Sequence, residues 1–174
     1  GESSRPGAKK ISIEEEMQRV IPSIIDFKKN NLVTQISLDT RNLPTMKLGL
    51  ESGVDIINDI SGFEDHNKIK FVSKFNLPVI VMHMQNEPNN MQIEPKYSFA
   101  PIDIYKILSK RVNLLIQMGV NKSNIVVDPG IGFGKNIYHN LEILRNVSLF
   151  HSLGVPILIG LSRNFYSRSF SKRL

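Results

Sequence analysis

The sequence predicts an α/β protein built around a parallel sheet. Short apolar runs rich in β-branched residues alternate with longer amphipathic stretches, and this alternation is typical of right-handed βαβ units. The runs expected to be strands lie at residues 34–38, 54–57, 78–82, 125–127 and 156–161. A length of 174 residues suits one domain with one hydrophobic core.

The stretches between these runs carry helix start and stop signals. Ser12 and Glu15 form a capping-box pattern before the first helix, in which Pro22 is expected to cause a kink or reset the start. The acidic run 14–16 is expected to form a solvated face. Further helices are expected near residues 42–53, 64–75, 101–119 and 136–154.

Two architectures fit five strands in this order. One is an open doubly wound sheet, and the other is a (β/α)₈ barrel that lacks its ends. Both place ligands at the carboxyl ends of the strands. The one long connection, residues 83–99, is rich in Asn, Pro and Gln and is predicted to be a functional loop.

Composition excludes several classes of protein. The absence of cysteine rules out disulfides, cysteine-based zinc sites and a thiol nucleophile. No apolar run approaches the ~18 residues of a membrane span, and no signal peptide opens the chain, so we expect a cytoplasmic protein with no membrane partner. The net charge is +6, but residues 163–174 hold four basic and no acidic residues, which leaves 18 basic and 16 acidic residues elsewhere. Nucleic-acid binding is therefore not predicted.

Each predicted strand is followed by polar residues that can bind a ligand. These residues are Asp39-Thr40, Asn58-Asp59, His83, Asp128-Pro129-Gly130 and Ser162-Arg163. Each alone is typical of a helix cap or turn, but five at one edge of a parallel sheet predict a shared polar pocket. Carboxylates suit the paired N–H edge of an aminopyrimidine-like ring, and Arg5 and Arg163 suit an anionic group.

The glycine-rich segment 128–135 has two interpretations. Its backbone N–H groups either approach an anion at a helix start or belong to a tight turn. The segment matches neither the P-loop nor the dinucleotide-binding pattern. The four histidines lack metal-site spacing, and no Gly-x-Ser-x-Gly elbow is present. Neither a histidine metal site nor a serine triad is predicted.

Six segments, taken in order, resemble dihydropteroate synthase. They are GESSRPGA (1–8), SLDTR (37–41), IINDI (56–60), MHMQ (82–85), DPGIGFGK (128–135) and GLSR (160–163). The resemblance runs over residues 1–163 and implies a partial pterin-binding domain: an incomplete (β/α)₈ TIM barrel with about five of its eight strands. Residues 164–174 form a basic tail without family resemblance.

The resemblance implies a transferase of folate biosynthesis. Such enzymes condense (7,8-dihydropterin-6-yl)methyl diphosphate with p-aminobenzoate and release diphosphate. The chemistry needs positioning and stabilisation of the leaving anion, so no residue is assigned a covalent catalytic role. Mg²⁺ is expected to assist, with its ligand in an amino-terminal segment absent from this chain. The family is commonly a homodimer. A non-catalytic remnant that at most binds a pterin is the alternative, and an unrelated flavodoxin-like binding module is a third.

The family's pterin-binding roles transfer by motif. Asp39, Asn58 and Asp128 are expected to hold the pterin ring, with Met82 and Phe133 along its faces. The residues expected to bind diphosphate and p-aminobenzoate are Ser4, Arg5, Pro6 and Ser162.

Three positions depart from the family pattern. Ser4 replaces Thr and keeps the hydroxyl, and Asn86 replaces Gly in the long loop. Asn164 stands where the family has a Lys that contacts both substrates, which puts that contact in doubt.

Overall fold

Four short parallel strands form one sheet in the computed structural model, which describes residues 1–5, 7–30 and 33–161. The strands follow the order β1-β2-β3-β4. Their bounds are Ser37–Asp39 for β1, Ile56–Asp59 for β2, Val79–Met82 for β3 and Ile125–Asp128 for β4. Pro6, Ser162, Asn164 and the tail 164–174 lie outside the described residues.

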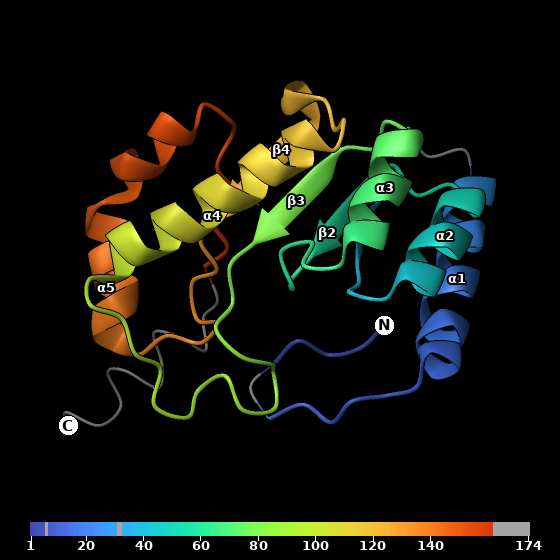
Figure 1. Cartoon of the computed structure of the whole chain (residues 1–174). Helices are drawn as coiled ribbons and strands as arrows, with labels where there is room; N and C mark the ends of the chain where they lie inside the picture. Colours follow the sequence, from blue (N-terminus) through green and yellow to red (C-terminus); the bar gives the residue numbers. More distant parts are fainter. Residues whose placement is uncertain (6, 31–32, 162–174) are drawn as a thin grey trace.

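Helices connect these strands in a regular alternation (Figure 1). They are α1 (Ile13–Lys29), α2 (Leu43–Glu51), α3 (His66–Lys74), α4 (Ala100–Gln117) and α5 (Ile137–Arg145), with 3₁₀ segments η1 (Lys122–Asn124) and η2 (Val147–Leu153). Capping explains two of the starts. The Ser12 side chain accepts the backbone N–H of Glu15, and Asn136 with His139 forms a full capping box at α5.

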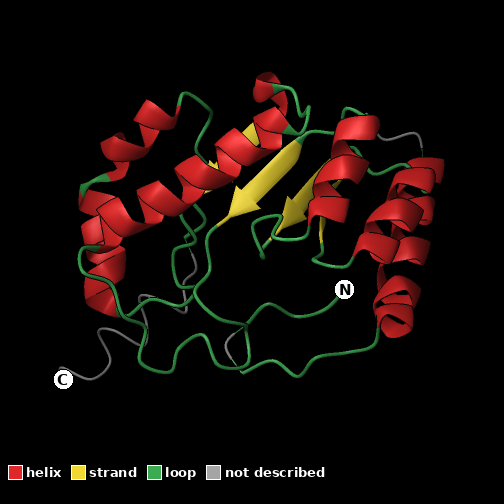
Figure 2. Ribbon diagram, in the orientation of Figure 1, coloured by secondary structure: helices red, strands yellow, loops and turns green. Residues whose placement is uncertain are grey.

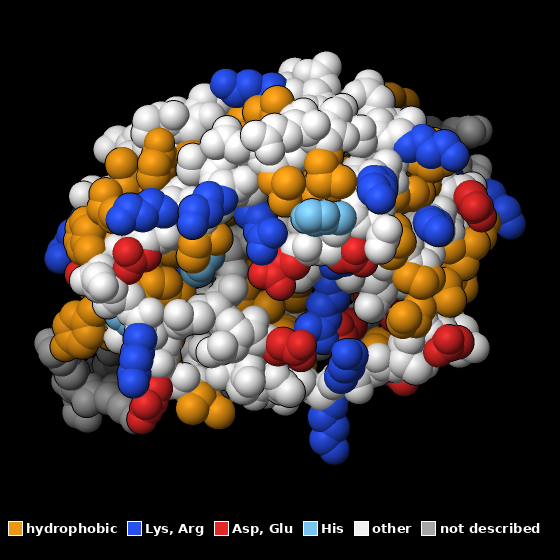
Figure 3. Space-filling model, viewed as in Figure 1, with side chains coloured by type: hydrophobic (Ala, Val, Ile, Leu, Met, Phe, Trp, Pro, Cys, Tyr) orange, Lys and Arg blue, Asp and Glu red, His pale blue; other side chains and the backbone are white. Residues whose placement is uncertain are grey.

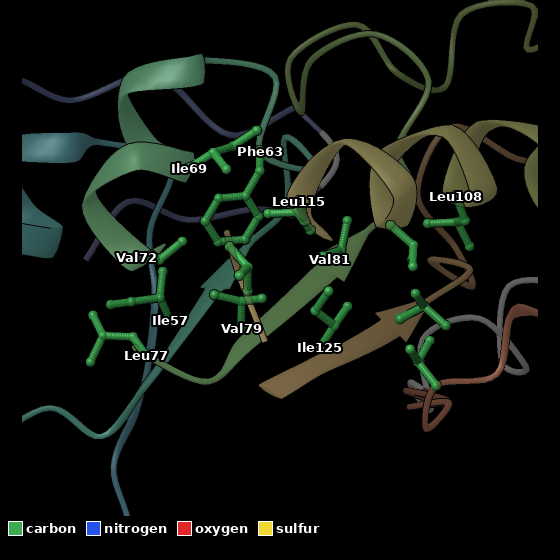
Figure 4. Close-up of a cluster of buried hydrophobic side chains, with 14 of the residues drawn as sticks. Ile57, Phe63, Ile69, Val72, Leu77, Val79, Val81, Leu108, Leu115 and Ile125 are labelled. Atoms are coloured by element: carbon green, nitrogen blue, oxygen red, sulfur yellow. The ribbon is translucent and has the colours of Figure 1, made fainter. Parts of the chain in front are cut away.

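The hydrophobic core lies between the helices and one face of the sheet. Ile57, Val79, Val81 and Ile125 on this face meet side chains of α3 and α4 (Figure 4). All five helices contribute to the same cluster. A doubly wound sheet carries helices on both faces, whereas sequential parallel strands with helices on one face form an arc of a (β/α)₈ barrel. The structure therefore selects the incomplete barrel.

The prediction of a fifth strand at residues 156–161 is wrong, because the described residues of this range form no strand. Ile157 forms an isolated bridge with Val127, and two backbone hydrogen bonds flank it: Val127 to the Pro156 carbonyl and Leu158 to the Val127 carbonyl. Pairing stops there, and Leu158 and Leu161 are exposed. The barrel arc thus has four strands rather than five.

The helices differ from those expected from the sequence in smaller ways. The expected helix 136–154 is two segments, because α5 ends at Arg145 and η2 follows. α1 runs without interruption through Pro22, so Pro22 does not reset its start. Glu16 is 1% exposed, although it was expected on a solvated face with Glu14 and Glu15. The amphipathic period brings it inward, on the same side of α1 as the core.

The loops at the carboxyl ends of the strands gather at one edge of the molecule. The strand arrows point toward this edge, where the amino-terminal segment and loop 83–99 lie (Figure 2). The Gly7 backbone N–H donates to the Pro88 carbonyl at 2.9 Å, which joins the two segments. This edge is where a parallel barrel places its ligands.

Candidate functional site

Strand register brings the predicted ring-binding residues onto one face of the sheet. Asp39 pairs with Asn58, and Met82 pairs with Asp128. Asn58 also pairs with Ile80, and Ile80 with Val126, two residues before Asp128. Neighbours in register share a face, as do residues two apart on one strand. Asp39, Asn58, Met82 and Asp128 therefore face away from the helices, on strands about 4.8 Å apart.

Asn58 carries an unusual buried atom. Its side-chain Oδ1 is shielded from solvent and has no hydrogen-bond partner among the described residues. A buried acceptor without a partner costs about 1–3 kcal/mol, so proteins keep very few of them. The arrangement leaves an acceptor for an N–H donor that the described residues do not supply.

Asp39, one strand away, remains solvent accessible. Desolvation by the surrounding protein raises the pKa of its carboxyl, the N-terminal ammonium opposes this rise, and the carboxylates of Asp59 and Glu16 add to it. Asp39 therefore forms the solvent-accessible edge of the site at β1.

Asp128 at the end of β4 is a buried carboxylate. Its Oδ1 accepts the Gly130 backbone N–H at 2.7 Å. Burial raises its pKa to about 6, although the Gly130 hydrogen bond and the nearby Lys135 ammonium act in the opposite direction. Asp128 is thus ionised at neutral pH at a cost in folding free energy, which is typical of a carboxylate kept for binding.

Lys135 is almost fully buried behind this carboxylate. Its Nζ lies 2.7 Å from the Phe133 carbonyl, 3.1 Å from His83 Nδ1 and 3.2 Å from the His83 carbonyl. Burial lowers the pKa of Lys135 to about 7, and Asp128 partly restores it. Burial and the Lys135 charge lower the pKa of His83 to about 3. The imidazole is therefore neutral, and Lys135 ties the end of β3 to the glycine-rich segment.

The glycine-rich segment 128–135 folds as a tight turn against β3. A Cβ on Gly130 would lie 2.0 Å from the His83 carbonyl oxygen, so only glycine fits there. The backbone N–H groups of Gly130, Gly132 and Phe133 all donate within the protein. Of the two interpretations, the structure favours the turn over a backbone anion site. Phe133 lies half-buried within it.

Loop 83–99 packs on the outside of this turn. Tyr97 Oη donates to the Gly134 carbonyl at 2.8 Å, and Gln92 Nε2 donates to the Gly132 carbonyl at 2.6 Å. Asn86 has φ +64°, a left-handed conformation that Asn adopts more readily than most residues. This explains how Asn is accommodated where the family pattern has Gly.

Asp59 does not belong to the site. It follows Asn58 directly and so points to the opposite, helix-covered face. There its fully buried carboxylate accepts from Lys68 Nζ at 3.0 Å, from Ser61 and from the Phe63 backbone N–H. Asp59 therefore stabilises the turn between β2 and α3.

Of the residues predicted to bind diphosphate and p-aminobenzoate, Ser4, Arg5 and Pro6 belong to the amino-terminal segment. Ser4 is half-buried and Arg5 is exposed. The segment is held at Glu2, whose backbone N–H reaches Glu16 Oε1 at 3.3 Å. Pro6 and Ser162, which are predicted to bind the same groups, lie outside the described residues.

The described part of the chain lacks two further features. There, no three His, Asp or Glu side chains cluster as a metal site. None of its helices is long and apolar enough to cross a bilayer. On the face drawn in Figure 3, basic and acidic side chains are interspersed with apolar ones.

The family model for pterin binding enzymes matches residues 1–173. The chain belongs to this family. Within the pterin binding enzymes it is 39% identical over 163 residues to the dihydropteroate synthase of Haemophilus influenzae and 37% identical to that of Escherichia coli. Each alignment covers 94% of this chain but only 59% and 57% of those proteins. The chain therefore spans less than two thirds of these relatives.

Solved dihydropteroate synthases share the fold of this pterin binding enzyme. A Yersinia pestis structure with a sulfonamide drug gives a TM-score of 0.92 at 32% identity, covering 98% of this chain and 62% of that one. A Xanthomonas albilineans structure with 4-aminobenzoic acid gives 0.89 at 32% identity, covering 100% and 61%. A second structure from that organism, in complex with 7,8-dihydropteroate, gives 0.85 at 28% identity and covers 97% and 61%.

Local sequence patterns do not identify two residues around this site. In the sequence Lys135 is the end of a glycine-rich motif, and Arg41 is part of the SLDTR segment. The signal for each was its position directly beyond a predicted site residue or turn. Their burial and partners depend on segments far away in the sequence, which no local pattern contains.

Proposed function

We propose that this chain forms the dihydropterin-binding part of a dihydropteroate synthase. The enzyme would condense (7,8-dihydropterin-6-yl)methyl diphosphate with p-aminobenzoate and release diphosphate. Family membership and similarity to dihydropteroate synthases, including structures with 4-aminobenzoic acid and 7,8-dihydropteroate, support the proposal.

The observation that carries the proposal is the pairing of an orphaned acceptor with a buried carboxylate on one face. Asp128 presents an anionic oxygen pair to two parallel N–H groups, such as those of an aminopyrimidine edge. Asn58 Oδ1 accepts a further ring N–H and so relieves its own burial cost. Both side chains select a flat, donor-rich heterocycle over an apolar ring.

The residues of this chain act by binding and orientation. At neutral pH Asp128 is ionised and grips the ring, because its pKa is about 6. The C–O bond to diphosphate breaks, the electron-rich pterin stabilises the resulting CH₂ cation, and the arylamine nitrogen attacks and releases a proton. Arg5, exposed on the amino-terminal segment, is proposed to attract the anionic groups.

Other expectations stay proposals. Mg²⁺ would supply charge neutralisation for the departing diphosphate, but the described residues form no cluster to hold it, and no step above uses it. A cytoplasmic location and a homodimer are further proposals. The alternative is a remnant that binds a pterin without catalysis.

Direct titration of the 174-residue chain with a 6-substituted dihydropterin tests the ring site. Asn58→Leu should weaken binding at least tenfold, because it removes the acceptor. Its folding stability should not fall by more than about 1 kcal/mol, since the lost oxygen had no partner. Asn113→Ala on the exposed face of α4 is the matched control and should bind like the wild type.

The same preparations distinguish enzyme from remnant. Condensation with p-aminobenzoate by the wild-type chain supports catalysis, whereas dihydropterin binding without product supports the remnant. Unchanged dihydropterin affinity in a folded Asn58→Leu variant would contradict the ring site.

A further inference from the structure

Arg41 is a partly buried cation that the proposed chemistry does not use. It lies two residues beyond Asp39, at the end of β1, with its side chain 14% exposed. Its Nε donates to Glu2 Oε2 at 2.8 Å and its Nη2 to Glu2 Oε1 at 3.2 Å. Two parallel hydrogen bonds fix the orientation of the Glu2 carboxylate as well as its distance from Arg41. A lysine ammonium, which acts as a point charge, would fix only the distance.

A third contact extends from the same guanidinium. Arg41 Nη1 lies 3.6 Å from Glu87 Oε2 in loop 83–99. Arg41 therefore contacts both segments that gather over the carboxyl ends of the strands. Together they line a small hollow, whose walls include Glu2, Ser3, Lys10, Arg41, Glu87 and Asn89.

Hydrogen bonds to Glu16 hold the residues on either side of Arg41 in place. The buried Glu16 carboxylate accepts from Thr40 Oγ1 at 3.0 Å and from Asn42 Nδ2 at 2.9 Å, the residues on either side of Arg41. Burial alone would raise the pKa of Glu16, but hydrogen bonds from Thr45, Asn42 and Thr40 outweigh this and lower it. A charged anchor on α1 thus holds the turn that carries Arg41.

Glu2 is tied to the same anchor. Its backbone N–H reaches Glu16 Oε1 at 3.3 Å while its carboxylate pairs with Arg41. The amino-terminal segment is therefore fixed relative to β1 at Glu2, and relative to loop 83–99 through Gly7 and Pro88. Ser4 and Arg5 lie between these two attachments.

We propose that Arg41 is a positioning residue that seats the amino-terminal segment, with Ser4 and Arg5, over the end of β1. Resting on the proposed function, this makes binding of the anionic second substrate depend on Arg41, while dihydropterin binding on the sheet face does not. Among the described residues, the hydrogen bonds and ion pairs of the Arg41 side chain go to Glu2 and Glu87, and Arg41 acts through these two residues.

Hydrogen exchange on the unliganded 174-residue chain tests the seating. Arg41→Met should accelerate exchange of the Glu2 and Gly7 amides about tenfold, because the segment loses its two-bond attachment. Arg41→Lys, which keeps the charge but loses the fork, should give a smaller acceleration. Arg111→Met is the matched control, because it breaks the 2.9 Å ion pair with Glu64 away from this segment.

Ligand titration tests the consequence. In Arg41→Met saturated with dihydropterin, the apparent KM or Kd for p-aminobenzoate should rise about tenfold, with dihydropterin affinity within twofold of wild type. Equal losses for both ligands, or unchanged Gly7 exchange in a folded Arg41→Met, would overturn the proposal. If the wild type binds neither ligand, the proposed function fails, while amide exchange still decides the role of Arg41 in seating the segment.

Discussion

Asn58 and Asp59 are neighbours in sequence but lie on opposite faces of β2, and their side-chain oxygens differ in hydrogen bonding. Asn58 Oδ1 is buried without a hydrogen-bond partner in the described part of the chain, whereas Asp59 is fully buried and paired with Lys68 at 3.0 Å. The Asn58 oxygen keeps its acceptor capacity on the proposed ligand face, whereas the Asp59 carboxylate is fully hydrogen-bonded within the fold. The proposed binding residue and the structural residue are therefore distinguished by their hydrogen bonds more clearly than by residue type.

Asp59→Ala should destabilise the fold without acting on the ligand face. It leaves the Lys68 ammonium buried without its anion, which costs about 3–5 kcal/mol. It also frees the turn in which Phe63 is held at φ +55°. Denaturant unfolding measures the loss. The double variant Asp59→Ala/Lys68→Met should recover part of it, and a double variant less stable than Asp59→Ala would contradict the assignment.

Asp128→Asn should stabilise the protein while weakening dihydropterin binding. The folded-state pKa of Asp128 is about 6, raised by burial from an ordinary 3.8, so its contribution to stability is lost as pH rises through 6. Removing the charge should gain at most about 3 kcal/mol at pH 8. The gain should shrink below pH 4. Urea unfolding at both pH values measures it, and a variant less stable than wild type at pH 8 would count against this interpretation.

His83 should make the fold sensitive to acid. Its pKa is lowered to about 3 from 6.5 by burial and by Lys135, so the unfolded chain takes up a proton first as pH falls below 6.5. Stability present above pH 6.5 is therefore lost on acidification, by about 2 kcal/mol at pH 5. His83→Gln keeps an acceptor for Lys135 but does not ionise. Its unfolding midpoint should change less between pH 7.5 and pH 5 than that of the wild type, and equal changes would refute the role of His83.

Gly130 and Gly132 give a matched pair of substitutions within one turn. Both have positive φ, +70° and +87°, so alanine is strained at either position. At Gly130 the new Cβ would also lie 2.0 Å from the His83 carbonyl, whereas at Gly132 nothing lies within 4 Å. We expect Gly132→Ala to cost about 1 kcal/mol and Gly130→Ala at least about 3 kcal/mol in thermal unfolding. Equal losses of stability in the two variants would show that the end of β3 moves to make room for the new Cβ at residue 130.

The end expected for the second strand places Asp59 among the polar residues that follow the strands. The sequence pattern ended the second strand at Ile57, which left Asn58 and Asp59 as loop residues free to point anywhere. The structure extends β2 through Asp59, and a residue added to a strand takes the next face in the alternation. An expected strand end two residues too early therefore hides that Asn58 and Asp59 lie on opposite faces of the sheet.

Local sequence patterns predict the alternation of strands and helices, the long loop 83–99 and the polar residues at the strand ends. These features depend on local periodicity and on neighbouring side chains, which the linear order contains. Only the tertiary structure decided between a barrel arc and a doubly wound sheet, because that choice depends on which face the helices cover. It also buried Glu16 and Lys135 and joined Arg41 to Glu2, since each of these states depends on partners brought together by packing rather than by sequence.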